Sequence, residues 1–165
     1  MQNIQIATEQ HIPLIKEMAC TIWQVAYKHI LKPQQMKYML EKFYSFSSLK
    51  KQMNEQQHKF IIATDNKKSF GFASYSLKEN FTDIFRLHKL YVLPEEQRKG
   101  TGRFLLDYII ADIKLKNAKI LELNVNRENN ARSFYEKTGF RITDEIDIAI
   151  GKGYFMNDYV MQKTL

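Results

Sequence analysis

The sequence predicts an α/β fold in which a mixed central β-sheet carries helices on both faces. Three observations predict it. A strand-like run ending near Val92 leads through a glycine turn into an apolar helix, and a second strand follows from Ile120. Two β-hairpins flank this unit, and three helical segments precede them. A strand, a helix and a second strand normally form a right-handed crossover between parallel strands, whereas hairpins are antiparallel, so the sheet is expected to be mixed.

The composition is that of a globular protein. The 165 residues suffice for one domain, 1–165, with a substantial core. The chain is 44% hydrophobic and 13% aromatic, which excludes a disordered chain. Cys20 is the sole cysteine, so a disulfide framework or a cysteine-rich metal site is excluded, and a cytoplasmic location is the simplest interpretation. No signal region or membrane-spanning run is found.

The N-terminal part, about residues 8–57, is predicted to be mainly helical after a short strand around residues 4–6. Apolar residues recur at helical spacing from Ile12 to about His29, and Pro33 opens a second helix that runs to about Tyr44. Ser47 or Ser48 is expected to cap a third, short helix.

Three aromatic residues of these helices either line a substrate site or pack in the core, and packing is the more common use of aromatics at helical spacing. They are Trp23, Tyr27 and Tyr38. The histidines at His11, His29 and His58 lack the spacing of metal ligands, so no metal site is expected.

The remaining elements follow from alternation, turn residues and apolar spacing. A hairpin is expected from strands 59–64 and 69–77 around the turn 65–68, then a strand over 84–93, a helix from 102 to about 116, a strand over 120–125, a helix over 131–138, and a final hairpin of 141–150 with 154–162. Gly139 suits the position after a helix end.

The clearest functional pattern lies in LYVLPEEQRKGTGRFLL, residues 90–106. A strand end is stopped by Pro94, and Gly100 and Gly102 lead into a helix. The first turn of a helix has backbone N–H groups without partners and the positive end of the helix dipole, so it can hold an anion such as pyrophosphate. Glycines there let a ligand approach the backbone closely.

Basic residues surround the same turn. Arg98, Lys99 and Arg103 supply positive charge that suits phosphate oxygens. The turn is not a dinucleotide fingerprint, because the third glycine of that motif would fall at Leu105, and no GxxxxGK[ST] loop is present.

This stretch, with Gln97-x-x-Gly100-x-Gly102 between a strand and a helix, resembles the acetyl-CoA-binding segment of the GNAT N-acetyltransferases. Downstream, NNARSFYEKTGF at 129–140 resembles the family's second segment, N-x-A-x-x-x-Y-x-x-x-G-F. The resemblance implies a GNAT-like acyl-CoA N-acyltransferase fold with its cofactor core at about 84–140, and acetyl-CoA as cosubstrate without a metal. It also implies that the N-terminal helical region, about residues 8–57, selects the substrate. It further implies that the fourth and fifth strands splay apart around the pantetheine arm. The cofactor-binding residues that it implies are Leu90, Tyr91, Val92, Gln97, Arg98, Lys99, Gly100, Thr101, Gly102, Arg103, Asn129, Ala131 and Tyr135.

Acyl transfer to an amine needs a proton donor for the thiolate and an acceptor for the amine proton. Tyr135 stands where GNAT enzymes commonly place the tyrosine that protonates the thiolate, and the alternative is a tyrosine that only hydrogen-bonds the cofactor. Arg86 stands where many members carry a glutamate base. His88, on the same strand face, is the preferred substitute. Glu122, ordered water or a group on the N-terminal helices are the alternatives.

The preferred function is therefore transfer of an acetyl group from acetyl-CoA to a primary amine by direct attack. The acceptor is a small polyamine-like amine or a peptide or protein amine, and the N-terminal helices with the tail YFMNDYVMQKTL loosely resemble bacterial spermidine/spermine-type acetyltransferases. The alternatives are a non-catalytic CoA-binding regulatory module or a basic nucleic-acid-binding protein. The net charge of +7 is dispersed and no base-reading motif is present, so neither nucleic acid nor a membrane is expected as a partner. Strand edges of the final hairpin favour a homodimer.

Overall fold

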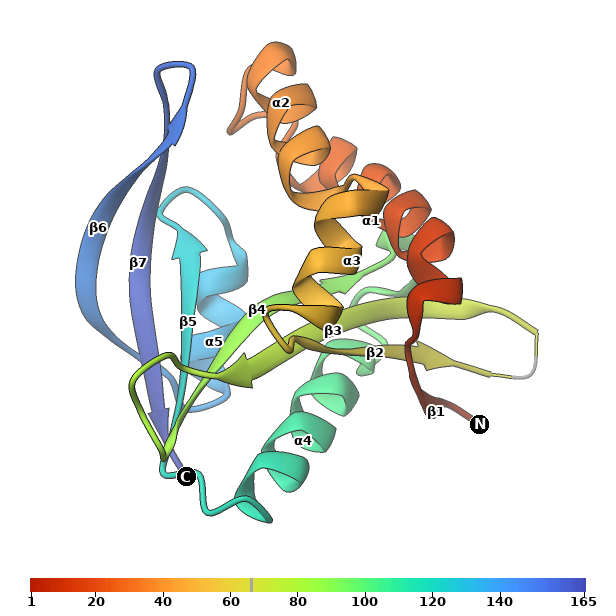
Figure 1. The fold of residues 1–165 in the computed structure, drawn as a ribbon, viewed down its shortest axis with the longest axis vertical. Helices are drawn as coiled ribbons and strands as arrows, with labels where there is room; N and C mark the ends of the chain where they lie inside the picture. Colours follow the sequence, from red (N-terminus) through yellow and green to blue (C-terminus); the bar gives the residue numbers. More distant parts are fainter. Residues whose placement is uncertain (66) are drawn as a thin grey trace.

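The computed structural model describes residues 1–65 and 67–165 and has the mixed seven-stranded sheet that the sequence predicts (Figure 1). The strand order is β1-β2-β3-β4-β5-β7-β6, with β4 and β5 parallel and the other neighbours antiparallel. The strands are β1 (Asn3–Ile6), β2 (Lys59–Thr64), β3 (Ser69–Leu77), β4 (Ile84–Val92), β5 (Ile120–Asn126), β6 (Arg141–Gly151) and β7 (Tyr154–Thr164).

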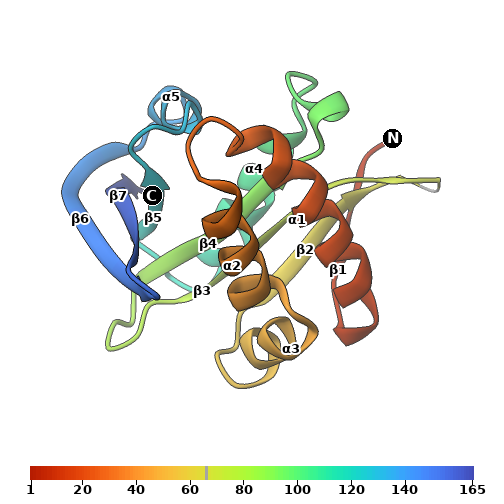
Figure 2. The same ribbon diagram turned by 90° about the horizontal axis from the view of Figure 1, so that it is seen from above.

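Helices cover both faces of the sheet, as predicted. Figures 1 and 2 show α4 on one side of β2, β3 and β4 and the N-terminal helices on the other. Two hydrophobic clusters correspond to these faces: one contains Leu105 and Ile109 of α4, and the other contains Ile15 and Trp23 of α1. The helices are α1 (Ile12–Ala26), α2 (Pro33–Tyr44), α3 (Phe46–Asn54), α4 (Thr101–Lys114) and α5 (Ala131–Lys137), with short 3-10 turns η1 (Glu9–His11) and η2 (Pro94–Glu96).

The predicted cap of the third helix is wrong. Ser45 has the extended backbone that an N-cap requires, and its Oγ accepts a hydrogen bond from the Ser48 N–H at 3.2 Å. Ser47 and Ser48 lie inside the first turn of α3, so a serine run alone did not identify the cap. The turn of the first hairpin includes Asn66, which lies outside the described residues.

A β-bulge interrupts β4 near the middle of the sheet. Ser74 lies opposite Lys89 and Tyr75 opposite Leu87, which leaves His88 without a partner on β3. Because side chains alternate along a strand, one extra residue moves each later side chain of β4 to the opposite face of the sheet. Beyond the bulge, residues 90 and 92 therefore pack on the α4 side and residue 91 on the side of the N-terminal helices.

A gap opens between β4 and β5. Their parallel pairing begins at Ile84 and ends at Leu87 opposite Leu123, although β4 continues to Val92 and β5 to Asn126. Residues 88–92 of β4 and 124–126 of β5 therefore do not pair with each other. This is the splay that the family resemblance implies, and it leaves backbone polar groups of β4 available to a ligand.

The β6–β7 hairpin is fastened to α2. Tyr38 donates its hydroxyl hydrogen to the Ile150 carbonyl at 2.6 Å, and Lys42 donates to the same oxygen at 2.8 Å. Gln35 donates to the Phe155 carbonyl at 3.2 Å. These bonds hold the hairpin beside α2, as Figure 1 shows. Within the described residues, no helix combines the length and apolar character needed to cross a membrane.

Candidate active site

The turn before α4 carries a row of free backbone donors. In the described part of the chain, the N–H groups of residues 98–103 donate no hydrogen bond to another protein group. Gly100 is the N-cap with φ of 88°, and a Cβ added there would meet no atom within 4 Å. The turn is therefore open toward solvent at the positive end of a 14-residue helix, which is the arrangement that binds phosphate groups.

An ion-pair network below the turn fixes its position. Glu96 is buried, and its carboxylate forms salt bridges with the ammonium groups of Lys68 at 2.6 Å and Lys99 at 3.4 Å. The hydrogen bond from Lys68 holds the pKa of Glu96 below its usual value. Sequence reasoning missed Lys68 and Glu96, which lie in different elements. A buried carboxylate between two lysines keeps the turn in one place while leaving its donors free.

The predicted phosphate-binding side chains differ in what they contact. Gln97 donates its side-chain N–H to the Val92 carbonyl at 3.3 Å, so it ties the turn to β4. Arg103 pairs with Asp107 one turn along the helix. Arg98 is exposed and forms no ion pair with any residue described by the structure. Thr101 is buried and accepts a hydrogen bond from Gln2 at 2.8 Å, so its side chain anchors the start of α4.

Strand β4, helix α4 and helix α5 converge at the gap. A Cβ on Gly102 would lie 3.6 Å from Phe134 and 3.8 Å from Leu90. On the β3 side of β4, the Leu93 N–H donates to the Phe70 carbonyl. Because strand residues alternate, the backbone groups of residues 90 and 92 point the other way, into the gap. The predicted segment Leu90–Val92 thus lies along the gap that starts at the phosphate turn.

Asn129 and Ala131 are held by a local turn. The Asn129 Oδ1 accepts the N–H of Ala131 at 2.9 Å, and its Nδ2 donates to the Tyr27 hydroxyl at 3.4 Å. The Tyr27 hydroxyl in turn lies 3.3 Å from that of Tyr91. Tyr27 therefore packs in the core, as is common for aromatics at helical spacing, and its hydroxyl contacts Tyr91 and Asn129. A role in substrate binding stays a prediction.

Tyr135 lies beside the same group of tyrosines. It is 7% exposed, packs against Phe134 and Phe140, and has no hydrogen-bond partner for its hydroxyl among the described residues. Burial raises the pKa of the Tyr135 hydroxyl, and the neighbouring Tyr27 raises it further. The side chain consequently keeps its proton at neutral pH and has that proton available for a ligand.

His88 occupies a crowded and electropositive place. Its ring stacks on that of His58 with centroids 3.7 Å apart, and its Nε2 lies 2.8 Å from the Ser76 Oγ. Burial lowers the pKa of His88 to about 2, with further contributions from His58, Lys89 and Arg86. This environment opposes protonation of the ring, so the role of His88 as base stays a prediction without support from its surroundings.

The carboxylate of Glu122 is already bound by neighbouring donors. Its carboxylate accepts two hydrogen bonds from Lys78 at 2.9 and 3.0 Å and one from Gln162 at 2.8 Å. Burial alone would raise the pKa of Glu122, but the bonds from Lys78 and Gln162 lower it. Arg86 lies opposite Glu122 in the sheet, with 3.9 Å between Nη1 and Oε1. A carboxylate that is saturated in this way is a weak proton acceptor.

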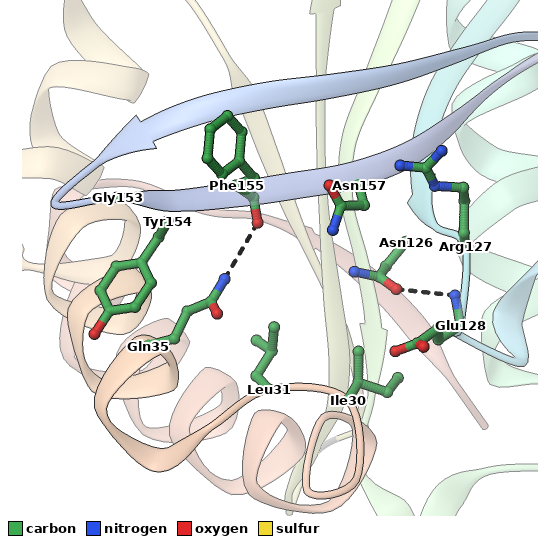
Figure 3. A pocket seen from close by; sticks show the side chains of 10 residues that line it. All are labelled: Ile30, Leu31, Gln35, Asn126, Arg127, Glu128, Gly153, Tyr154, Phe155 and Asn157. Atoms are coloured by element: carbon green, nitrogen blue, oxygen red, sulfur yellow. Dashed lines mark hydrogen bonds between the residues drawn. The ribbon is translucent and has the colours of Figure 1, made fainter.

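A cavity of about 440 Å³ opens between the α1–α2 connection, the end of β5 and the β6–β7 hairpin (Figure 3). Polar side chains of Gln35, Asn126 and Asn157 line it together with Ile30 and Leu31. Residues 126–128 directly precede Asn129 and residues 30–31 closely follow Tyr27, so the cavity adjoins the tyrosine group. Sequence reasoning missed it because its walls come from three distant segments. In the described residues, no group of three or more metal-ligating side chains could hold a metal ion.

A gap between two parallel strands and an anion-binding turn at a helix N-terminus are the features that the family resemblance implies for an acyl-CoA-dependent acyltransferase. The chain belongs to the GNAT family, since the family model of the acetyltransferase (GNAT) domain matches residues 27–153. This confirms the resemblance seen in the two sequence segments.

Individual relatives agree with this assignment. The chain is 33% identical over 112 residues to the [ribosomal protein bS18]-alanine N-acetyltransferase of Haemophilus influenzae, covering 68% of this chain and 70% of the relative. It is 29% identical over 147 residues to the spermidine N(1)-acetyltransferase of Thermoplasma acidophilum, covering 84% and 88%. The solved PaiA N-acetyltransferase of Thermoplasma acidophilum, in complex with coenzyme A, has the same fold with a TM-score of 0.85 at 24% identity, covering 100% and 99%. The chain is thus an acetyl-CoA-dependent N-acetyltransferase, and the enzyme prediction is preferred over the binding-module alternatives.

Proposed function

We propose that the chain acetylates a primary amine of a small polyamine-like molecule or of a peptide or protein, with acetyl-CoA bound along β4. The row of free N–H groups at residues 98–103 carries this proposal, because it lies at one end of the β4–β5 gap. The phosphates of acetyl-CoA would bind this turn, helped by Arg98, Lys99 and Arg103. The pantetheine arm would follow Leu90–Val92, with Asn129 on the opposite side of the gap.

The chemistry is a direct attack. The nitrogen lone pair of the amine forms a bond to the thioester carbonyl carbon, and the carbonyl becomes a tetrahedral oxyanion that backbone N–H groups of β4 in the gap would stabilise. The C–S bond then breaks, Tyr135 donates its hydroxyl proton to the departing thiolate, and the tyrosinate takes up the extra proton that the nitrogen loses as the amide forms. The Tyr135 hydroxyl has no hydrogen-bond partner among the described residues, so its proton is free to reach the sulfur. Its raised pKa makes it a weaker acid, so the transfer requires direct contact with the thiolate.

The acceptor would approach through the 440 Å³ cavity, from the side opposite the phosphate turn. The names of two relatives support an amine acceptor, one being a spermidine N(1)-acetyltransferase and the other acting on an alanine of a ribosomal protein. The polar lining by Gln35, Asn126 and Asn157 suits a hydrogen-bonding amine chain.

The test is release of free thiol from acetyl-CoA with spermidine and with a peptide that begins with alanine. Tyr135→Phe should lower kcat about 10²-fold while the Kd of acetyl-CoA changes less than twofold. Tyr108→Phe is the matched control, because Tyr108 is a half-buried tyrosine of α4 that packs against the core cluster, and it should behave as the wild-type protein. An unaltered kcat in Tyr135→Phe would contradict the role of this tyrosine. No thiol release with any amine would contradict the activity itself.

We also propose a homodimer and a cytoplasmic location. The hairpin strand β6 forms one end of the sheet, and an uncovered strand edge is a ready surface for a second copy. A single cysteine, Cys20, suits a reducing compartment. Light scattering at working concentration tests the first proposal, and a monomeric mass would remove it. Fractionation of cells that express the protein tests the second.

A further inference from the structure

We propose that Asp158 of β7 accepts the proton of the substrate ammonium group, in place of the strand β4 carboxylate that this chain lacks. The inference rests on the proposed function above. It assigns the base to a strand on the far side of the gap, a position that the sequence did not suggest.

Asp158 lies in β7 directly after Asn157, which lines the cavity. It is opposite Asn126 of β5 and Ile146 of β6, and Asn126 also lines the cavity. Alternate β7 residues share a face, and Met156 packs in the cluster of the N-terminal helices. Asp158 therefore points toward the same side as Tyr27, and its charge contributes to raising the pKa of the Tyr27 hydroxyl.

The carboxylate is buried and has no bonding partner. Asp158 is 5% exposed, and in the part of the chain that the structure describes no hydrogen bond or ion pair reaches its oxygens. Buried polar groups normally have partners, and Glu122 on the neighbouring strand accepts three hydrogen bonds from two residues. The Asp158 oxygens are not among the fully buried atoms without a partner, so they keep a path to solvent. A mostly buried carboxylate without a protein partner and with such a path is placed to receive a cationic ligand.

The charges around Asp158 explain how it can act as a base near neutral pH. Burial raises the pKa of Asp158 to about 6, and Arg127 and Arg86 keep it from rising further. The end of α1 contributes Tyr27, and β6 contributes the uncharged Ile146. Arg127 is itself paired with Glu145 and Asp147, so its charge is shared. At pH 7 the carboxylate is mostly ionised and can attract an ammonium group.

The proton transfer is balanced. An alkylammonium nitrogen, with a reference pKa of about 10.4, gives one proton to an Asp158 oxygen and so recovers the lone pair that attacks the thioester. The carboxylate of a group with a pKa near 6 is a stronger base than that of one with the ordinary value of about 3.9. The difference between the pKa of the ammonium donor and that of the acceptor is therefore smaller. The thiol product takes its proton from Tyr135, and Tyr135 is reprotonated by the second proton that the nitrogen loses as the amide forms. Asp158 and Tyr135 therefore handle different protons, and Asp158 returns its proton to solvent.

The test is the pH dependence of kcat/KM with spermidine between pH 5 and 10. The kcat/KM of the wild-type protein should rise with pH through a pKa near 6 to a plateau. Asp158→Asn should lose about 10²-fold at pH 7 and then rise tenfold per pH unit toward the pKa of the amine, because only the free amine reacts. Asp144→Asn, an exposed carboxylate on β6, is the matched control. The Kd of acetyl-CoA should stay within twofold in both variants.

Three results would overturn the inference while leaving the acetyltransferase activity in place. The first is an Asp158→Asn variant with an unchanged rate and acid limb. The second is a variant in which KM rises at constant kcat and the acid limb remains, which would mean recognition without proton transfer. The third, which needs no variant to fold, is an unchanged protein whose kcat/KM shows no limb near pH 6. Absence of turnover by the unchanged protein would instead refute the proposed function.

Discussion

Replacing Gly100 by alanine separates the conformational role of the phosphate turn from its ligand-binding role. Gly100 has φ of 88°, and a Cβ there would touch no protein atom within 4 Å. The cost to the fold is therefore only the left-handed backbone of a non-glycine residue, about 1–2 kcal/mol. For a chain of this size, this corresponds to a fall in Tm of about 2–8 °C.

A matched control is Gly153→Ala. Gly153 has φ of 76° and equally open space around its Cβ position, but it lies in the β6–β7 hairpin, away from the phosphate turn. The two variants should lose similar stability. Only Gly100→Ala should lose affinity for acetyl-CoA, because the new methyl group would occupy the space through which phosphate oxygens reach the backbone N–H groups.

Thermal shift with added acetyl-CoA measures both effects. At a ligand concentration of about 100 Kd, the gain for the unchanged protein is about 2.7 kcal/mol, or a rise of about 5–11 °C. A tenfold weaker Kd, about 1.4 kcal/mol, would halve the ligand-induced rise in Gly100→Ala and leave it intact in Gly153→Ala. An equal ligand-induced rise in both variants would refute the assignment of this turn to the phosphates.

Three further predictions concern buried charges. Asp158→Asn should raise the free energy of unfolding at pH 7 by about 1–3 kcal/mol. The pKa of Asp158 is near 6 in the folded state and near 3.8 in the unfolded chain, so ionisation of the carboxyl opposes folding above pH 6. Urea unfolding at pH 7 and pH 4 should show that this gain disappears at the lower pH. The pKa of His88 is lowered from 6.5 to about 2, so the unfolded chain binds more protons than the folded protein below pH 6.5. The free energy of unfolding of the wild-type protein should therefore fall by up to about 2 kcal/mol between pH 6.5 and 5 through this group. His88→Gln, unfolded in urea at the same two pH values, should show a smaller fall. Glu96→Gln should weaken acetyl-CoA binding about three- to tenfold in titration calorimetry, because Lys68 and Lys99 lose the carboxylate that fixes the turn; a Kd equal to that of the unchanged protein would show that the network does not order the binding turn.

The sequence predicts best what is local. The strand, turn and helix around Gly100 follow from residues that are close in the chain, and the structure has them with small shifts in boundaries. Helix periodicity likewise identifies α1 and α2. The serine cap of α3 was misplaced because three serines at positions 45, 47 and 48 offer similar side chains, and only the backbone geometry distinguishes them.

What the sequence could not supply depends on register between distant segments. His58 and His88 are 30 residues apart, and their stacking, which lowers the basicity of His88, requires the bulge in β4. Glu122 reads as a free carboxylate until Lys78 is placed beside it. Asp158 sits in an ordinary strand pattern, and nothing local shows that β7 inserts between β5 and β6 and brings this residue beneath Tyr27.

The position of β7 also means that the two parts of the site depend on different contacts. The phosphate turn and its lysine anchors belong to the β3, β4 and α4 region, whose contacts are mostly between neighbouring elements. Strand β5 has an open edge unless β7 pairs with it over residues 120–126. Without that pairing the anion-binding turn would keep its own contacts, the strand edge would be prone to self-association, and Asp158 would be absent from the site. We therefore expect variants that weaken the β5–β7 pairing to affect the proposed proton transfer more than cofactor binding.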